Sequence, residues 1–169
     1  MSSITLEAIE ASSDDELFAL LGHESESRIS AKKGSAEFVE QIRNLPVGLR
    51  AMAATYELDV SLALDDLGWH FGNWHNEDLA EETAQGLREL GAYDLAELFA
   101  KAFQSAKNYW TELGSDNWME WYHDSPFEES VNAFTRQAWE ILKDKPHGIF
   151  KYWVDYARRH PERVGTKDA

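Results

Sequence analysis

The sequence predicts an all-α protein, a single-domain bundle of about seven or eight helices with a central antiparallel helix hairpin. Three observations support this prediction. Apolar residues recur at spacings of three and four along most of the chain, whereas strand-like alternation is almost absent. Capping residues, glycines and prolines begin and end these periodic stretches. The 169 residues are 43% hydrophobic, which suits one domain with a sizeable core.

The first half of the chain predicts three helices. A run of Ser, Asp and Glu begins the first helix, Gly22 would end it, and the polar residues 23–34 would form a loop. Ser35 caps a short second helix. Pro46 can open a long third helix that runs to about Leu67, because a first helical turn tolerates proline.

The middle of the chain predicts the helix hairpin. Residues 68–75 contain two Gly, two Trp and two His, which indicates a packed connection or a kinked helix end. Asn76 then caps a helix that Gly91 ends, and a second amphipathic helix follows over residues 92–113. Because the link between these two helices is short, we expect them to pack antiparallel.

The C-terminal part predicts a short aromatic and acidic helix over residues 115–125, then helices opened by Pro126 and Pro146. No linker or internal repeat divides the chain. The expected organisation is one all-helical domain over residues 1–164, in which residues 1–11 could be flexible, and a disordered tail over residues 165–169.

Composition excludes several classes of function. The chain has no Cys, which excludes disulfides, thiolate zinc sites and Cys nucleophiles. It has no apolar run of membrane-spanning length and no signal peptide at its start, so we expect a cytoplasmic protein. It also lacks a phosphate-binding glycine loop and a dinucleotide fingerprint, and we expect no cofactor.

Acidic residues outnumber basic ones by 31 to 16, and they are unevenly spread. Residues 51–100 carry a net charge of −10, whereas residues 136–169 carry +3. This balance disfavours direct contact with nucleic acid or a membrane and favours a basic protein partner. The alternative is that the charge serves only solubility.

One helix face concentrates this charge. In the helix expected over residues 77–89, Leu79, Thr83 and Leu87 share a core-facing arc, and the acidic residues Asp78, Glu81, Glu82 and Glu89 lie opposite. Like charges three or four residues apart weaken a helix by a few tenths of a kcal/mol per pair, so stability alone does not favour them. Carboxylates on successive turns stand about 5.4 Å apart, a spacing on the scale of DNA phosphates.

Tryptophans in the irregular segments add candidate interface anchors. Trp69, Trp74, Trp118 and Trp121 do not fall on core stripes, and buried tryptophans often dominate binding energy at interfaces. The residues that we expect to contact a partner are Asp65, Asp66, Glu77, Asp78, Glu81, Glu82, Glu89, Trp69 and Trp74.

A metal site is the enzymatic alternative. Asp66 and His70 are four residues apart and could share a helix face with His75 nearby, as a metal-dependent hydrolase would require. His123 and Asp124 are a second pair with general-base chemistry. The spacing is not an HExxH pattern, and Gly68 and Gly72 weaken the helix that would hold the metal, so we expect neither a metal site nor catalytic residues.

The stretch LALDDLGWHFGNWHNEDLAEETAQGLRELGAYDLAELFAKAF resembles the DMP19-like family, whose members are all-helical bacterial proteins named for a neisserial DNA mimic. The resemblance extends over about residues 45–160 and includes FEESVNAFTRQAWEIL and FKYWVDYARRHPERV. The Asn-Gly-Gly-aromatic turn of the family is present here only as Leu67-Gly68-Trp69, with Asn73 displaced. The resemblance implies a single all-helical domain, a homodimer and no known catalysis.

The leading hypothesis is therefore a non-enzymatic acidic interaction module, a DNA mimic that occupies the basic site of a nucleic-acid-binding protein such as a DNA-binding regulator. An immunity-type protein that masks a basic toxin would show the same electrostatics. A metal-dependent hydrolase and a charge that serves only solubility are competing hypotheses.

Overall fold

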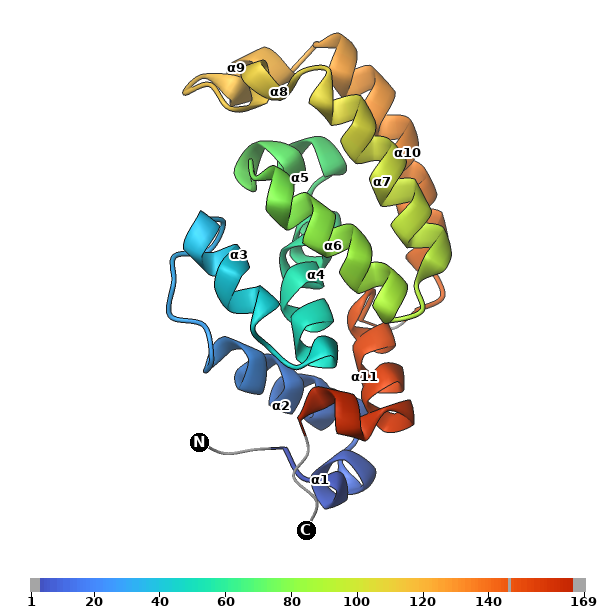
Figure 1. The fold of residues 1–169 in the computed structure, drawn as a ribbon. Helices are drawn as coiled ribbons and strands as arrows, with labels where there is room; N and C mark the ends of the chain where they lie inside the picture. Colours follow the sequence, from blue (N-terminus) through green and yellow to red (C-terminus); the bar gives the residue numbers. More distant parts are fainter. Residues whose placement is uncertain (1–3, 146, 166–169) are drawn as a thin grey trace.

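A computed structural model describes residues 4–145 and 147–165. Within these ranges the chain is all-α, with eleven α-helices and one short 3-10 helix and no strand (Figure 1). The helices are α1 (Leu6–Ala11), α2 (Asp14–Glu26), α3 (Ala36–Arg43), α4 (Val47–Leu64), α5 (Leu67–Asn73), α6 (Glu77–Glu89), α7 (Tyr93–Lys107), α8 (Trp110–Leu113), α9 (Trp118–Tyr122), α10 (Pro126–Leu142), α11 (Phe150–Arg159) and the 3-10 helix η1 (Pro161–Val164).

The predicted fold class is confirmed, but the described residues contain more helices than the seven or eight expected. Gly22 does not end a helix, because α2 continues to Glu26. The long helix expected to reach Leu67 ends at Leu64, and a separate helix, α5, follows after a break at Asp65. The helix expected over residues 92–113 likewise divides into α7 and α8.

The start of the last helix differs from expectation, and the structure describes only part of the two ends of the chain. Residues 6–11, which could have been flexible, form α1, and Ile9 is buried in the core. The last helix begins at Phe150, and Pro146, which was expected to open it, lies outside the described residues. The expected disordered tail falls mostly on residues 166–169, which also lie outside them.

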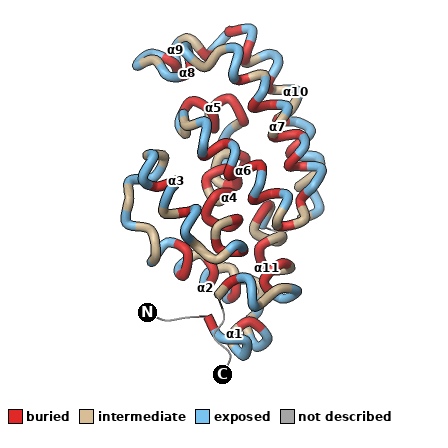
Figure 2. The backbone as a smooth tube through the Cα atoms, in the orientation of Figure 1, coloured by how far each residue is buried: buried red, intermediate tan, exposed pale blue. Residues whose placement is uncertain are grey.

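Helix α4 is the centre of the bundle, and the buried positions follow it and the helices around it (Figure 2). Its side chains Leu49, Met52 and Leu58 are fully buried. The indole Nε1 of the buried Trp153 donates a hydrogen bond of 3.0 Å to the Thr55 hydroxyl, which fixes α11 against α4. The indole N–H of Trp153 and the hydroxyl of Thr55 are therefore both hydrogen-bonded within the core.

The central hairpin consists of α6 and α7, as the sequence predicts (Figure 1). Gly91 takes a φ of +83° between them, a conformation that side chains other than glycine rarely adopt. The N–H groups of Gly91 and Ala92 bond back to the carbonyls of Arg88 and Leu87. These bonds satisfy the free carbonyls at the end of α6 and turn the chain toward α7.

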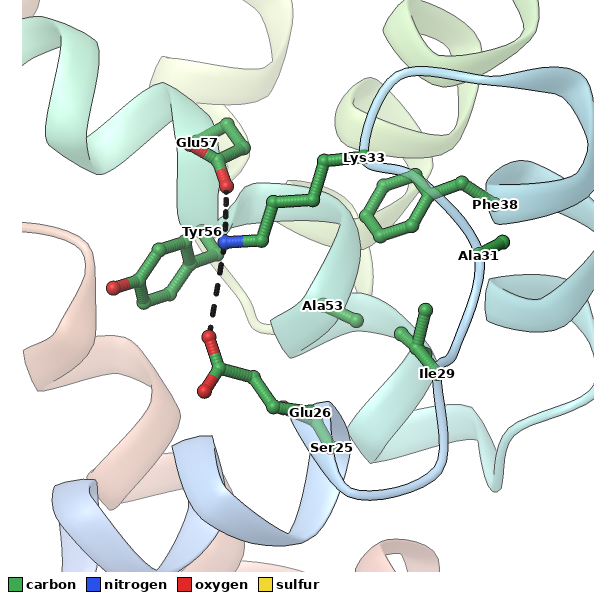
Figure 3. A pocket seen from close by; sticks show the side chains of 9 residues that line it. All are labelled: Ser25, Glu26, Ile29, Ala31, Lys33, Phe38, Ala53, Tyr56 and Glu57. Atoms are coloured by element: carbon green, nitrogen blue, oxygen red, sulfur yellow. Dashed lines mark ion pairs between the residues drawn. The ribbon is translucent and has the colours of Figure 1, made fainter.

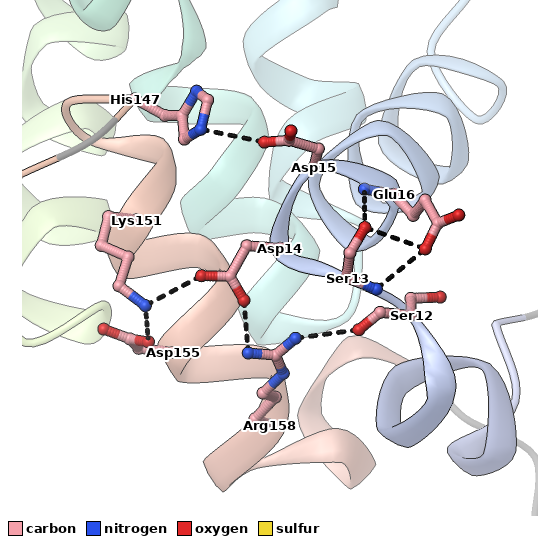
Figure 4. A network of polar contacts seen from close by, with 9 residues as sticks. All are labelled: Ser12, Ser13, Asp14, Asp15, Glu16, His147, Lys151, Asp155 and Arg158. Carbon is pink, nitrogen blue, oxygen red and sulfur yellow. Dashed lines mark hydrogen bonds and ion pairs between the residues drawn. The ribbon is translucent and has the colours of Figure 1, made fainter.

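Basic side chains of α11 form ion pairs with an acidic residue at the start of α2 (Figure 4). Asp14 accepts hydrogen bonds from Lys151 at 3.1 Å and from Arg158 at 2.5 Å, and these contacts hold its pKa below the usual range. Beside it, Ser13 and Glu16 form a capping box at the start of α2. The positive charge of α11 is therefore partly used within the molecule and does not form an isolated basic patch.

Candidate protein-interaction site

The structure changes the role expected for Glu82 on α6. Its side chain is only 3% exposed, and its carboxylate lies between two arginines. Arg43 Nε donates to Oε1 at 2.7 Å, and Arg50 Nε donates to Oε2 at 2.8 Å. The prediction that Glu82 contacts a partner is incompatible with this burial. The helix packs against α3, α4 and α7, so its buried arc is wider than the apolar stripe.

The other carboxylates of α6 are mostly paired within the chain. Glu77 lies 3.0 Å from Lys107, Asp78 lies 3.2 Å from Arg43, and Glu89 lies 2.8 Å from Arg163. Glu89 also accepts a hydrogen bond from the Tyr156 hydroxyl. Within the described ranges, only Glu81 of this acidic face is exposed without an ion pair. The acidic face of α6 is therefore largely neutralised by residues distant in sequence.

Asp65 and Asp66 lie at the break between α4 and α5. Asp66 caps α5 by accepting the Trp69 N–H at 2.8 Å, and it also accepts the Tyr122 hydroxyl at 3.0 Å. Asp65 is exposed. Partial burial and the neighbouring Asp66 charge raise its pKa, and His123 opposes this rise. Asp66 is thus a structural residue, and Asp65 beside it faces solvent close to α9.

A second acidic region lies beside this junction, in α8, α9 and the start of α10 (Figure 1). Residues 108–135 contain six acidic residues and no Lys or Arg. Of these carboxylates, those of Glu112, Asp116, Glu120, Asp124 and Glu129 are exposed. Among the residues that the structure describes, no lysine or arginine forms an ion pair with any of the six. The negative charge of this region is therefore not offset by any lysine or arginine that the structure describes.

Contacts join this region to α5 through aromatic side chains. The Trp69 ring packs edge-on against Trp118 with centroids 5.1 Å apart, and it lies 6.4 Å from the His123 ring. Trp118 fills the space above Gly72, where a Cβ would come within 2.4 Å of the indole. We call the surface formed by Asp65, Trp69, Met119, Glu120, Trp121, His123 and Asp124 the α5–α9 end. It combines exposed carboxylates with half-exposed aromatic side chains and an exposed Met119.

The two tryptophans expected at an interface have different surroundings. Trp69 is half-buried and belongs to the α5–α9 end. Trp74 is also half-buried, but it packs on a separate apolar cluster that includes Phe38, Ile42 and Leu79. Only Trp69 therefore lies beside the unpaired carboxylates.

The three residues of the hydrolase alternative are committed to different contacts. Asp66 is the helix cap described above. His70 is buried, its Nδ1 lies 3.0 Å from the Ser61 hydroxyl, and burial lowers its pKa to about 3. His75 stacks on Trp110 and its Nε2 lies 2.7 Å from the Trp110 carbonyl. Over residues 4–145 and 147–165, no three His, Asp or Glu side chains are grouped to hold a metal ion.

His123 and Asp124, the second pair with catalytic chemistry, form the turn after α9. Asp124 takes a φ of +63° and donates its N–H to Glu128 Oε2 at 2.7 Å. His123 is exposed, with Nδ1 3.8 Å from Glu128 Oε1. The pair therefore contributes charge and a turn to the α5–α9 end.

The sequence alone contained a signal for this end. Residues 108–135 contain no Lys or Arg, and this absence indicates an acidic surface as clearly as the net negative charge of residues 51–100 does for α6. What the sequence does not show is which carboxylates are neutralised by cations from elsewhere in the chain.

Comparison with known protein families gives a match. A family model described as DMP19-like protein matches residues 43–160, which is more than half of the chain. No match was found among curated proteins or among solved structures. Separately, no helix in the described part of the chain is long and apolar enough to cross a bilayer.

Proposed function

The chain belongs to the DMP19-like family, and from this premise we propose that it is an acidic protein-interaction module that occupies the basic site of a nucleic-acid-binding protein. The surface that makes the contact in this proposal is the α5–α9 end. The acidic face of α6 has at most a supporting role, through Glu81.

The observation that carries the proposal is that no described Lys or Arg forms an ion pair with the carboxylates of this end. A carboxylate that already pairs with Lys or Arg has little charge left for a partner. Asp65, Glu120 and Asp124 have no such pair among the described residues, and each is exposed. Unpaired carboxylates attract a basic surface and raise the rate of association, an effect that salt screens over about 10 Å at 0.1 M.

Aromatic side chains supply the second part of the argument. Charge complementarity alone raises the association rate and the selectivity of binding more than it raises the affinity. Trp69 and Trp121 are half-buried beside these carboxylates, and Met119 is 46% exposed. Trp and Met are enriched at protein interfaces, where apolar anchors contribute much of the binding energy. An acidic surface with apolar anchors suits a protein partner.

A triple variant tests this proposal. Asp65→Asn, Glu120→Gln and Asp124→Asn remove three charges without removing a helix cap, and asparagine tolerates the positive φ at position 124. The immobilised chain captures proteins from the native lysate at low salt, rising salt elutes them, and mass spectrometry identifies them. We expect the wild type to retain a DNA-binding protein and to block its binding to labelled DNA, and the triple variant to do neither.

A matched control separates this site from net charge. Glu10→Gln, Glu40→Gln and Asp94→Asn remove three exposed carboxylates elsewhere and change the net charge equally. This control should behave like the wild type. Equal losses in both variants would mean that charge acts non-specifically, and a retained partner that still binds DNA at saturation would exclude DNA mimicry. Retention of a single basic toxin would instead identify an immunity protein. Light scattering of the same preparation measures the expected homodimer.

A further inference from the structure

A small cavity lies where α2, α4 and the loop over residues 27–35 meet, on elements that do not form the α5–α9 end (Figure 3). Its volume is about 110 Å³. Ile29, Phe38 and Ala53 line its apolar side, and Figure 3 shows the Lys33 side chain reaching across it from the loop. The cavity therefore has an apolar wall and a charged end.

The charged end is built around a buried carboxylate. Glu57 is only 8% exposed, and its Oε1 accepts no well-aligned hydrogen bond within the described part of the chain. The Lys33 ammonium lies 2.8 Å from this oxygen, 3.7 Å from Glu26 and 4.7 Å from the centroid of the Tyr56 ring (Figure 3). Two carboxylates and the face of one aromatic ring thus surround a single ammonium group.

This combination is selective for an ammonium group on an apolar stem. A buried carboxylate is costly unless a cation balances it, and an aromatic face attracts a cation within about 6 Å. The apolar wall contacts the methylene stem that carries the charge. Burial alone would lower the pKa of Lys33, but Glu57 and Glu26 together hold it above its ordinary value, so the ammonium stays charged.

Lys33 is nevertheless held loosely enough to be replaced. Its side chain is 45% exposed, and it comes from a loop and not from a helix. The loop itself is fixed on both sides of Lys33, because Gln41 accepts the Ala31 N–H at 3.1 Å and Asn76 donates to the Gly34 carbonyl at 3.0 Å. The side chain can therefore leave the pocket without unfolding the loop.

We propose that this pocket is a binding site for a primary alkylammonium group, which Lys33 occupies as an intramolecular ligand and from which an external ammonium displaces it. The external group is the side chain of a lysine or a free aliphatic amine, since both carry the same ammonium on the same kind of stem. The proposal is independent of the function proposed for the α5–α9 end.

Chemical rescue tests the proposal. Lys33→Ala leaves Glu57 without its cation, and n-propylammonium restores the group that this substitution removes. We expect the melting temperature of Lys33→Ala to fall and then to rise saturably with n-propylammonium, by about 3–5 °C at ten times the Kd. In the wild type the tethered Lys33 competes for the pocket, so the Kd of the same amine should be at least about tenfold higher than in Lys33→Ala.

Three controls define the site. 1-Propanol, the neutral analogue, should not rescue Lys33→Ala. Lys33→Met, which keeps the stem in the pocket, should not respond to the amine. Adding Glu57→Gln to Lys33→Ala should abolish the rescue. Rescue that persists in the Glu57→Gln background, or no rescue of Lys33→Ala at any amine concentration, would overturn the proposal and leave Lys33 as a structural counterion only.

A second measurement covers the case in which Lys33→Ala does not fold. Titration of the wild type with n-propylammonium, followed by NMR, should shift the signals of the Tyr56 ring and the Lys33 Cε protons together. Unchanged signals would overturn the proposal.

Cadaverine and Nα-acetyl-lysine amide then distinguish the two sources of the ammonium group, a free amine and a lysine side chain. Tighter binding of cadaverine supports a free amine, and tighter binding of the lysine derivative supports a protein side chain.

Discussion

Glu82→Gln replaces a buried carboxylate with a neutral group of nearly the same shape, between two guanidinium groups. Gln keeps one oxygen that can accept a hydrogen bond, but its amide nitrogen would face an arginine donor. Glu81→Gln makes the same chemical change one residue earlier, at an exposed side chain. The pair therefore isolates the effect of burial from the effect of losing a charge on α6.

The expected loss of stability follows from the contacts. Glu82 accepts from Nε of Arg43 and from Nε and Nη2 of Arg50, at 2.7, 2.8 and 2.9 Å. Hydrogen bonds to charged groups contribute about 1.5–3 kcal/mol each, but they are not additive. The arginine side chains are 39% and 34% exposed, so water can solvate them once the carboxylate is gone. We therefore expect Glu82→Gln to lower the free energy of unfolding by about 2–3 kcal/mol.

Urea unfolding followed by tryptophan fluorescence and circular dichroism measures this difference. Glu82→Gln should also melt about 5–10 °C below the wild type, given the usual scaling for a domain of this size. Glu81→Gln should stay within about 0.5 kcal/mol of the wild type. Equal unfolding midpoints for the two variants would refute the reasoning, because they would mean that Glu82 is not buried between the arginines in solution.

Two further predictions concern burial. Burial raises the pKa of Asp59 to about 6, so at this site the folded state binds the extra proton, and the contribution of Asp59 to stability falls as pH rises from about 4 to 6. Asp59→Asn should therefore raise the free energy of unfolding at pH 7 by about 1–3 kcal/mol, measured by urea unfolding at pH 5 and 7. His70 has a pKa of about 3 in the folded state, so its contribution to stability falls as pH drops below 6.5. Asp59 offsets this loss in the wild type, and Asp59→Asn should therefore lose stability more steeply on acidification. An unchanged pH profile would contradict this. Gly72→Ala should destabilise the chain by about 1–3 kcal/mol and shift its tryptophan fluorescence, because the added Cβ meets Trp118 at 2.4 Å. Gly22→Ala in α2 is the control, since nothing lies within 4 Å of its Cβ, and a Gly72→Ala variant as stable as this control would rule out the close contact.

Local sequence signals predicted most of the helices because their causes are local. Ser13, Ser35 and Asn76 each accept a backbone N–H at the start of a helix, as their residue types indicate. Gly91 ends α6 with a positive φ, which the sequence also predicts. Apolar periodicity identified the core-facing residues of α6 and α7 for the same reason.

The candidate site was only partly predictable. The sequence places Asp65 and Glu81 off the apolar stripes, and both are exposed, but it leaves open whether Trp69 is buried, and the structure shows it half-buried. It was wrong about Glu82, because helical periodicity treats every charged residue outside the apolar stripe as solvent-facing. The burial of Glu82 depends on Arg43 and Arg50, which lie 39 and 32 residues away along the chain.

By itself, the sequence determined the all-helical class, the α6–α7 hairpin and the total negative charge, since these depend on composition and on neighbours within a few residues. The tertiary structure decided where that charge remains available. Arginine and lysine side chains from distant segments neutralise the acidic face of α6, whereas none in the described part of the chain pairs with the carboxylates of α8 and α9. The physical reason is that ion pairing depends on distances of a few ångströms in space, which spacing along the chain does not specify.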